Sequence, residues 1–144
     1  MDLAAVSFPA LLVADDGWVQ HIENERGLAE MTHVAITTYN RRRVLIYDHR
    51  DHVWEVENIA LQTKRSVLGH LAHRLLNSQL PVQIEVRQVT DSPIQQVQEA
   101  LRTAIDSDDD ILTQNVGADD LKTAVQKATS YKALVGVLKS RGAI

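Results

Sequence analysis

The chain has 144 residues, of which 44% are hydrophobic and 24% are charged, and its formal net charge is −4. These values are typical of one globular domain, so they exclude wholesale disorder and argue against a protein dominated by nucleic-acid binding. The sequence contains no cysteine, which excludes disulfides, cysteine-based zinc sites and thiol catalysis.

The first apolar run covers residues 3–13 and is too short to span a bilayer. It follows Asp2 without any lysine or arginine, unlike the start of a signal peptide. We therefore expect a cytoplasmic protein that does not bind membranes.

The N-terminal part, residues 1–60, is predicted to be rich in strands. Its first two strands, 9–13 and 18–22, are separated by the step Asp16-Gly17. Such a step is a strong hairpin signal, because glycine adopts a positive φ angle without steric cost.

Three further segments of this part are rich in β-branched and aromatic residues and are separated by polar loops. They predict a three-stranded antiparallel meander, around which we expect the rest of the chain to be organised. The predicted strands are 34–39, 44–47 and 53–56, and the loops are 40–43 and 48–52.

The middle part, residues 61–90, is predicted to hold one helix and one strand. Apolar residues recur at helical spacing between Thr63 and Asn77. Apolar and polar residues then alternate over 82–86, which is the pattern of a strand with one buried face.

The C-terminal part, residues 91–144, is predicted to be helical. The step Asp91-Ser92-Pro93 places a capping oxygen before a proline, and the acidic residues 106–110 are expected to end that helix. Two more helices are expected to begin at Asp119 and after Ser130.

These elements predict a single α+β domain over residues 1–144. We expect a mostly antiparallel sheet of about five or six strands, packed against about three or four helices.

Aspartates are concentrated between the first and second of the three predicted C-terminal helices. A cluster of this kind can serve only to end a helix and keep it solvated, or it can attract a basic partner. We take the second interpretation as the candidate partner-binding site, which consists of Asp106, Asp108, Asp109, Asp110, Asp119 and Asp120.

Two other patterns suggest metals and are set aside. The spacing of Asp106, Asp108 and Asp110 resembles the start of a calcium loop, but Ile111 stands where the turn needs glycine, and Gly117 stands where a glutamate should be. The pairs His49/His52 and His70/His73 have no third ligand at a telling distance, and they are interpreted as polar surface. No metal or cofactor is therefore predicted.

Residues 41–43 are three consecutive arginines, with Arg50 and Lys64-Arg65 elsewhere in the chain. On a hairpin tip they could contact phosphate, so an RNA-contacting domain is one alternative. The only phenylalanine is remote, and nucleic acid remains the less favoured partner.

No nucleophile elbow, glycine-rich phosphate loop, His-Glu-x-x-His pair or kinase motif is present, so no catalytic residue is predicted. The protein is expected not to be an enzyme. The alternative is a small enzyme or ligand-binding domain with a polar pocket on the sheet.

The residues 109–116 and the two helices after them, 121–128 and 130–141, resemble in layout the small immunity proteins of bacterial toxin systems. The Asp16-Gly17-Trp18 turn and the hairpin 44–56 fit the same layout. The resemblance implies a cytoplasmic, non-enzymatic protein that binds a toxin domain, possibly a nuclease with a basic surface, and blocks its active site.

Overall fold

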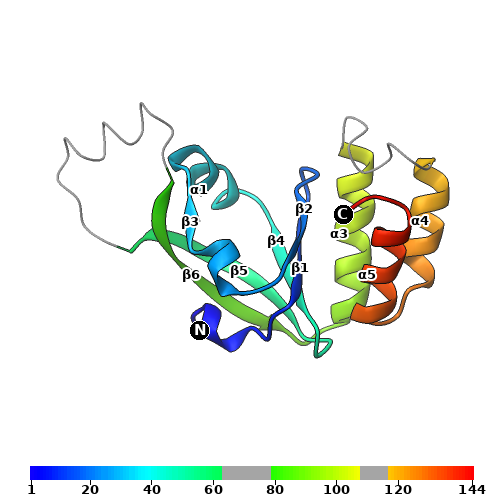
Figure 1. Ribbon diagram of the computed structural model, residues 1–144, viewed down its shortest axis with the longest axis horizontal. Helices are drawn as coiled ribbons and strands as arrows, with labels where there is room; N and C mark the ends of the chain where they lie inside the picture. Colours follow the sequence, from blue (N-terminus) through cyan, green and yellow to red (C-terminus); the bar gives the residue numbers. More distant parts are fainter. Residues whose placement is uncertain (63–78, 108–116) are drawn as a thin grey trace.

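The computed structural model describes residues 1–62, 79–107 and 117–144 (Figure 1). Within these ranges one curled, six-stranded sheet has the order β2-β1-β4-β5-β6-β3. Every neighbouring pair of strands is antiparallel. The strands are β1 (Ala10–Ala14), β2 (Val19–Ile22), β3 (Glu30–Met31), β4 (Val44–Asp48), β5 (Val53–Leu61) and β6 (Leu80–Val89).

Four α-helices and two short 3-10 helices complete the described part of the chain. The predicted α+β fold with a mostly antiparallel sheet is therefore confirmed. The helices are η1 (Leu3–Ala5), η2 (Glu25–Leu28), α1 (His33–Tyr39), α3 (Pro93–Ser107), α4 (Ala118–Lys127) and α5 (Tyr131–Ser140).

The predicted strand over 34–39 is wrong, because this segment forms the helix α1. The Thr32 side chain accepts a hydrogen bond from the Ala35 N–H at 3.1 Å and so caps the helix. The side chain of Asn40 then joins the end of α1 to β5, because it both donates to and accepts from the backbone of Ile59, each at 2.8 Å. Capping and packing together override the strand preference of the β-branched residues.

The two predicted hairpins on either side of α1 are present. Gly17 has a φ of 101°, as the tight turn between β1 and β2 requires. In the second hairpin, β4 and β5 pair Tyr47 with Val53. β5 continues to Leu61, five residues beyond the predicted end at Val56, and its register shifts between Val56 and Asn58.

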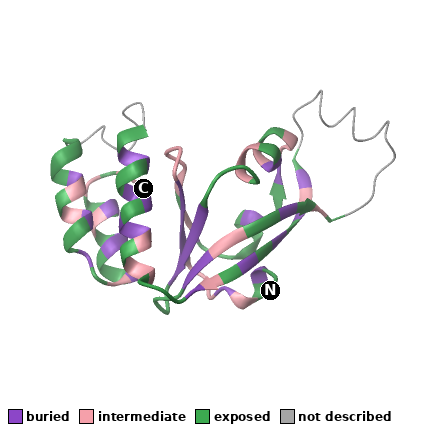
Figure 2. Cartoon of the chain, turned by 180° about the vertical axis from the view of Figure 1, so that it is seen from behind, coloured by how far each residue is buried: buried purple, intermediate pink, exposed green. Residues whose placement is uncertain are grey.

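The sheet is buried on both faces, which explains why β1 is a continuous apolar strand rather than an alternating one. Leu11 and Val13 pack with α3, α4 and α5, whereas Ala10 and Leu12 pack on the other face with η1, η2 and α1. Figure 1 shows α3, α4 and α5 together on one side of the sheet. The buried residues of these helices face the sheet, and the exposed ones face outward (Figure 2).

The C-terminal helices begin close to their predicted positions. The Ser130 side chain accepts a hydrogen bond from the Ala133 N–H at 3.2 Å, which confirms it as the N-cap of α5. The strand predicted at 82–86 is the central part of β6. The helix predicted over 63–77, with His70 and His73, lies outside the described residues.

Candidate functional site

The described aspartates of the predicted partner-binding cluster lie at one end of the helical layer. Asp106 belongs to the last turn of α3, and Asp119 and Asp120 belong to the first turn of α4. Acidic side chains at a helix N-terminus interact favourably with the helix dipole. We call these three residues the acidic end; Asp108, Asp109 and Asp110 lie outside the described residues.

Two cations of the same layer pair with the acidic end. Lys122 forms an ion pair with Asp106, and the Arg141 Nε lies 3.5 Å from a carboxylate oxygen of Asp120. The two aspartate side chains remain 62% and 64% exposed, respectively, so both carboxylates are still accessible to a partner. Because exposed ion pairs contribute little to stability, these contacts reduce the local charge without fixing the acidic end in place.

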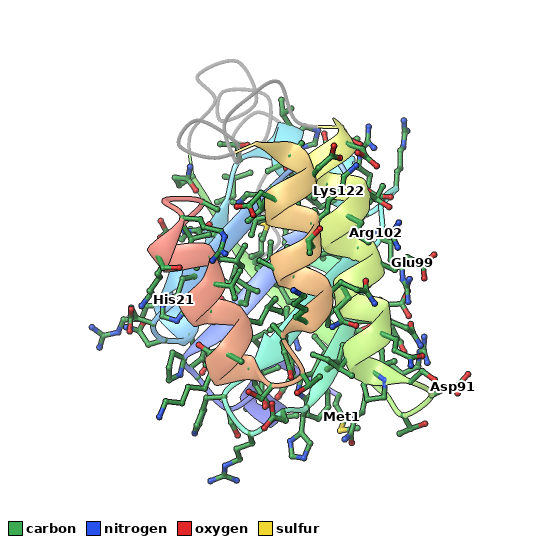
Figure 3. All side chains as sticks on the ribbon, turned by 90° about the vertical axis from the view of Figure 1, so that its right-hand side faces the viewer. Met1, His21, Asp91, Glu99, Arg102 and Lys122 are labelled. Carbon is green, nitrogen blue, oxygen red and sulfur yellow. The ribbon has the colours of Figure 1, made fainter. Side chains whose placement is uncertain are left out.

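A groove lies beside the acidic end, between α3 and α4. It consists of two adjoining cavities of about 500 Å³ and about 340 Å³, which share Arg102 and Gln126. The larger cavity is also lined by Ile94, Gln95, Gln98, Glu99 and Thr129, and the smaller one by Lys122, Thr123 and Lys127. We call this feature the α3–α4 groove. Figure 3 looks onto this layer and labels Lys122, Arg102 and Glu99 along it.

Gln98 sits between the two helices that form the groove. Its side chain is 5% exposed, and its Nε2 donates to the carbonyl oxygens of Val125, Gln126 and Ala128 at 3.2, 3.1 and 2.8 Å. These carbonyls belong to the C-terminal end of α4 and its C-cap, where most backbone acceptors have no partner within the helix. Gln98 therefore holds α4 against α3 and gives the groove a fixed shape.

The turn between β4 and β5 contains a buried carboxylate. Asp48 is fully buried and accepts hydrogen bonds from the N–H groups of Ser7, Arg50 and His52, at 3.3, 2.9 and 3.0 Å. It also accepts one from the Trp54 Nε1 at 2.9 Å. These hydrogen bonds hold the turn and its neighbours in place, and no cavity described above opens onto Asp48. The carboxylate is therefore a structural anchor.

Asp51 of the same turn, which has a φ of 64°, connects the sheet to α5. It accepts a hydrogen bond from the Tyr47 hydroxyl at 2.8 Å and another from the Tyr131 N–H at 2.7 Å. Burial raises the pKa of Tyr47 well above its ordinary value, and the bond to Asp51 raises it further. Burial also raises the pKa of Tyr131 to about 12. Both hydroxyls therefore stay protonated and act as hydrogen-bonding groups at neutral pH.

The described histidines are spread over the molecule. His49 and His52 flank the β4–β5 turn, where the His49 Nδ1 lies 2.9 Å from the Ser7 carbonyl oxygen and the His52 side chain is 48% exposed. His21 lies on β2 and contacts the Tyr131 hydroxyl through its Nε2 at 2.8 Å. Among residues 1–62, 79–107 and 117–144, no three His, Cys, Asp or Glu side chains are grouped so that they could hold a metal ion.

The arginines 41–43 follow the end of α1 and are not on a hairpin tip, because 34–39 is a helix. They line an open cavity of about 370 Å³. Arg42 lies 3.8 Å from Asp15 and 3.9 Å from Asp16, and the Arg43 Nε lies 3.4 Å from Glu55. These carboxylates counter the positive charge that a phosphate contact would use.

Comparison with known protein families, curated proteins and solved structures found no match. Within the described ranges, no helix is both long enough and apolar enough to cross a bilayer.

Sequence reasoning identified the acidic end but not the α3–α4 groove. Arg102, Gln126 and Lys127 lie on two different helices, and their proximity depends on how those helices pack. The only local signal was the helical spacing of polar residues on the outer faces of α3 and α4. Spacing of this kind shows which face is exposed, but it does not show that two exposed faces meet in a groove.

Proposed function

We propose that this chain is an immunity-type protein, which binds a toxin domain and neutralises it by covering its active site. The observation that carries this proposal is the adjacency of the acidic end and the α3–α4 groove on one helical layer. Ion pairing of Lys122 with Asp106 links the two features directly. Together they offer a partner a continuous surface with charges of both signs.

The charge of the acidic end favours a partner with a basic surface. Residues 106–120 contain six aspartates and no lysine or arginine. A concentrated charge of one sign raises the rate of encounter with an oppositely charged protein. Many nucleases have basic surfaces because they bind a polyanionic substrate, so a nuclease toxin is a suitable partner.

The construction of the helical layer also suits a stable protein interface. A specific interface buries about 800 Å² on each partner, which is more than an isolated small cavity offers. The outward side chains of α3 and α4 supply lysine, arginine, glutamine and threonine around the groove. A rigid helical surface loses little conformational entropy on binding, which favours affinity.

Affinity capture of the tagged protein from its own cells, at moderate salt, tests this proposal. We expect one stoichiometric protein partner, and expression of that partner alone should arrest growth while co-expression of this chain should restore it. A charge-reversal variant tests the contribution of the acidic end. With Asp106, Asp119 and Asp120 each changed to lysine, the chain should recover much less partner. If no partner is recovered, or if the recovered partner does not arrest growth, the immunity function is wrong.

A further inference from the structure

The α3–α4 groove is rich in hydrogen-bond donors. Arg102, Lys122 and Lys127 line it together with the side-chain amides of Gln95 and Gln126. Among the residues that the structure describes, Glu99 is the one carboxylate in its lining. A site with this balance of groups is complementary to a ligand that carries acceptors, above all carboxylates.

Arg102 occupies the central position of the groove, since it lines both cavities. Within the described ranges it forms no ion pair, whereas Lys122 is paired with Asp106. An arginine guanidinium presents five N–H donors in a planar fork, which matches the two oxygens of a carboxylate. Arg102 is therefore the group best placed to bind an acidic side chain, with Lys127 as the second cation.

The dimensions of the groove suit a short extended peptide. Gln95 and Arg102 are seven residues apart on α3, which corresponds to roughly 10 Å along the helix axis. Three residues of an extended peptide span about the same length. Alternate side chains of an extended peptide point to the same side, so two acidic residues separated by one other residue would both face the groove.

The neighbouring charges favour a peptide over a nucleic acid. A strand of nucleic acid that continued beyond the groove would meet the acidic end, where Asp119 and Asp120 would repel its phosphates. A protein segment can carry acidic residues over the groove and basic residues over the acidic end.

We infer that the α3–α4 groove binds an acidic segment of the partner protein, with two carboxylates in alternate positions and Arg102 and Lys127 as their main contacts. This inference rests on the proposed function for the identity of the partner, but it can be tested without that partner. It adds that the partner's binding surface is itself mixed, with an acidic segment beside a basic region.

An NMR titration with a capped Gly-Glu-Gly-Glu-Gly peptide tests the inference on the full chain. We expect amide shifts that are confined to the groove, with the largest changes at Arg102, Gln126 and Lys127. The matched neutral peptide Gly-Gln-Gly-Gln-Gly should cause shifts at least tenfold weaker. Shifts outside the groove only, or equal shifts with the neutral peptide, would overturn the inference.

Two double variants make the test specific. Arg102→Glu with Lys127→Glu should abolish the response to the acidic peptide, whereas Arg50→Glu with Lys132→Glu, at exposed positions outside the groove, should leave it unchanged. The milder variant Arg102→Gln should weaken binding of the acidic peptide by about tenfold. It replaces the double variant in this test if the double variant is unfolded. A stronger response to a short single-stranded oligothymidylate than to the acidic peptide would also contradict the inference.

Experiments with the partner then distinguish the immunity function from the groove assignment. If the peptide binds in the groove but no toxin partner is recovered from cells, the immunity function fails and the groove assignment stands. If a toxin partner is recovered and Arg102→Glu with Lys127→Glu leaves its affinity unchanged, the immunity function stands and the groove assignment fails.

Discussion

Replacing Asp48 with alanine is expected to lower the free energy of unfolding by about 3–5 kcal/mol, because the change leaves buried donors without a partner. Its carboxylate accepts hydrogen bonds from three backbone N–H groups and from the Trp54 indole. Ser7 and Trp54 lie outside the turn itself, so one side chain joins the N-terminal segment, the turn and the core. Water cannot easily take its place, since Asp48 is fully buried.

Urea denaturation followed by circular dichroism measures this loss. The variant Asp48→Asn keeps one acceptor oxygen and should lose less stability than Asp48→Ala. Glu30→Ala, at an exposed position, is the matched control and should change stability by no more than about 0.5 kcal/mol. A loss below about 1 kcal/mol for Asp48→Ala would show that the four hydrogen bonds do not anchor the turn.

Changing Asp106, Asp119 and Asp120 to asparagine is expected to slow association with the proposed toxin partner about tenfold at low salt. The three carboxylates are exposed on one end of the helical layer, where they would attract the basic surface of the proposed partner before contact is made. The effect should shrink as ionic strength rises, because the Debye length falls from about 30 Å at 0.01 M salt to about 8 Å at 0.15 M. The dissociation rate should change much less than the association rate.

Stopped-flow or surface-based kinetics over a range of salt concentrations measures both rates. The matched control changes three exposed glutamates, Glu25, Glu30 and Glu85, to glutamine. These residues lie on η2, β3 and β6, away from the helical layer. Neutralising their three carboxylates lowers the net negative charge by the same amount as the three aspartate substitutions. An equal slowing in the control would mean that total charge, rather than the acidic end, attracts the partner.

Much of the fold could be predicted from local patterns. The Asp16-Gly17 step and the alternation around Ile84 specify a turn and a strand through the geometry of the backbone alone. Ser130 and the apolar spacing of α5 similarly define a helix start and its buried face. These signals act within a few residues, so sequence reasoning can detect them.

The segment that forms α1 shows where local reasoning fails. Its valine, isoleucine, threonines and tyrosine favour a strand, and nothing in the segment itself shows that Asn40 will bond to the backbone of β5. Ile36 is buried against the sheet while Val34 is 63% exposed, a pattern that suits a single packed face of a short helix. The helix therefore depends on a contact across nineteen residues of sequence.

The candidate site was predictable only in part for the same reason. Aspartates cluster in the sequence, so the acidic end could be predicted, but its pairing with Lys122 and Arg141 depends on packing. The network of Asp48, Asp51 and Tyr131 joins residues up to eighty positions apart. Only the folded structure brings such groups together.

The most direct test of the central claim is an inhibition titration of the captured toxin partner. Its enzymatic activity would be measured against increasing amounts of this protein at physiological salt. We predict that activity falls to zero at one equivalent, and that the variant with Asp106, Asp119 and Asp120 changed to lysine requires a large excess. Full activity of the partner in the presence of saturating protein would contradict the proposed immunity function.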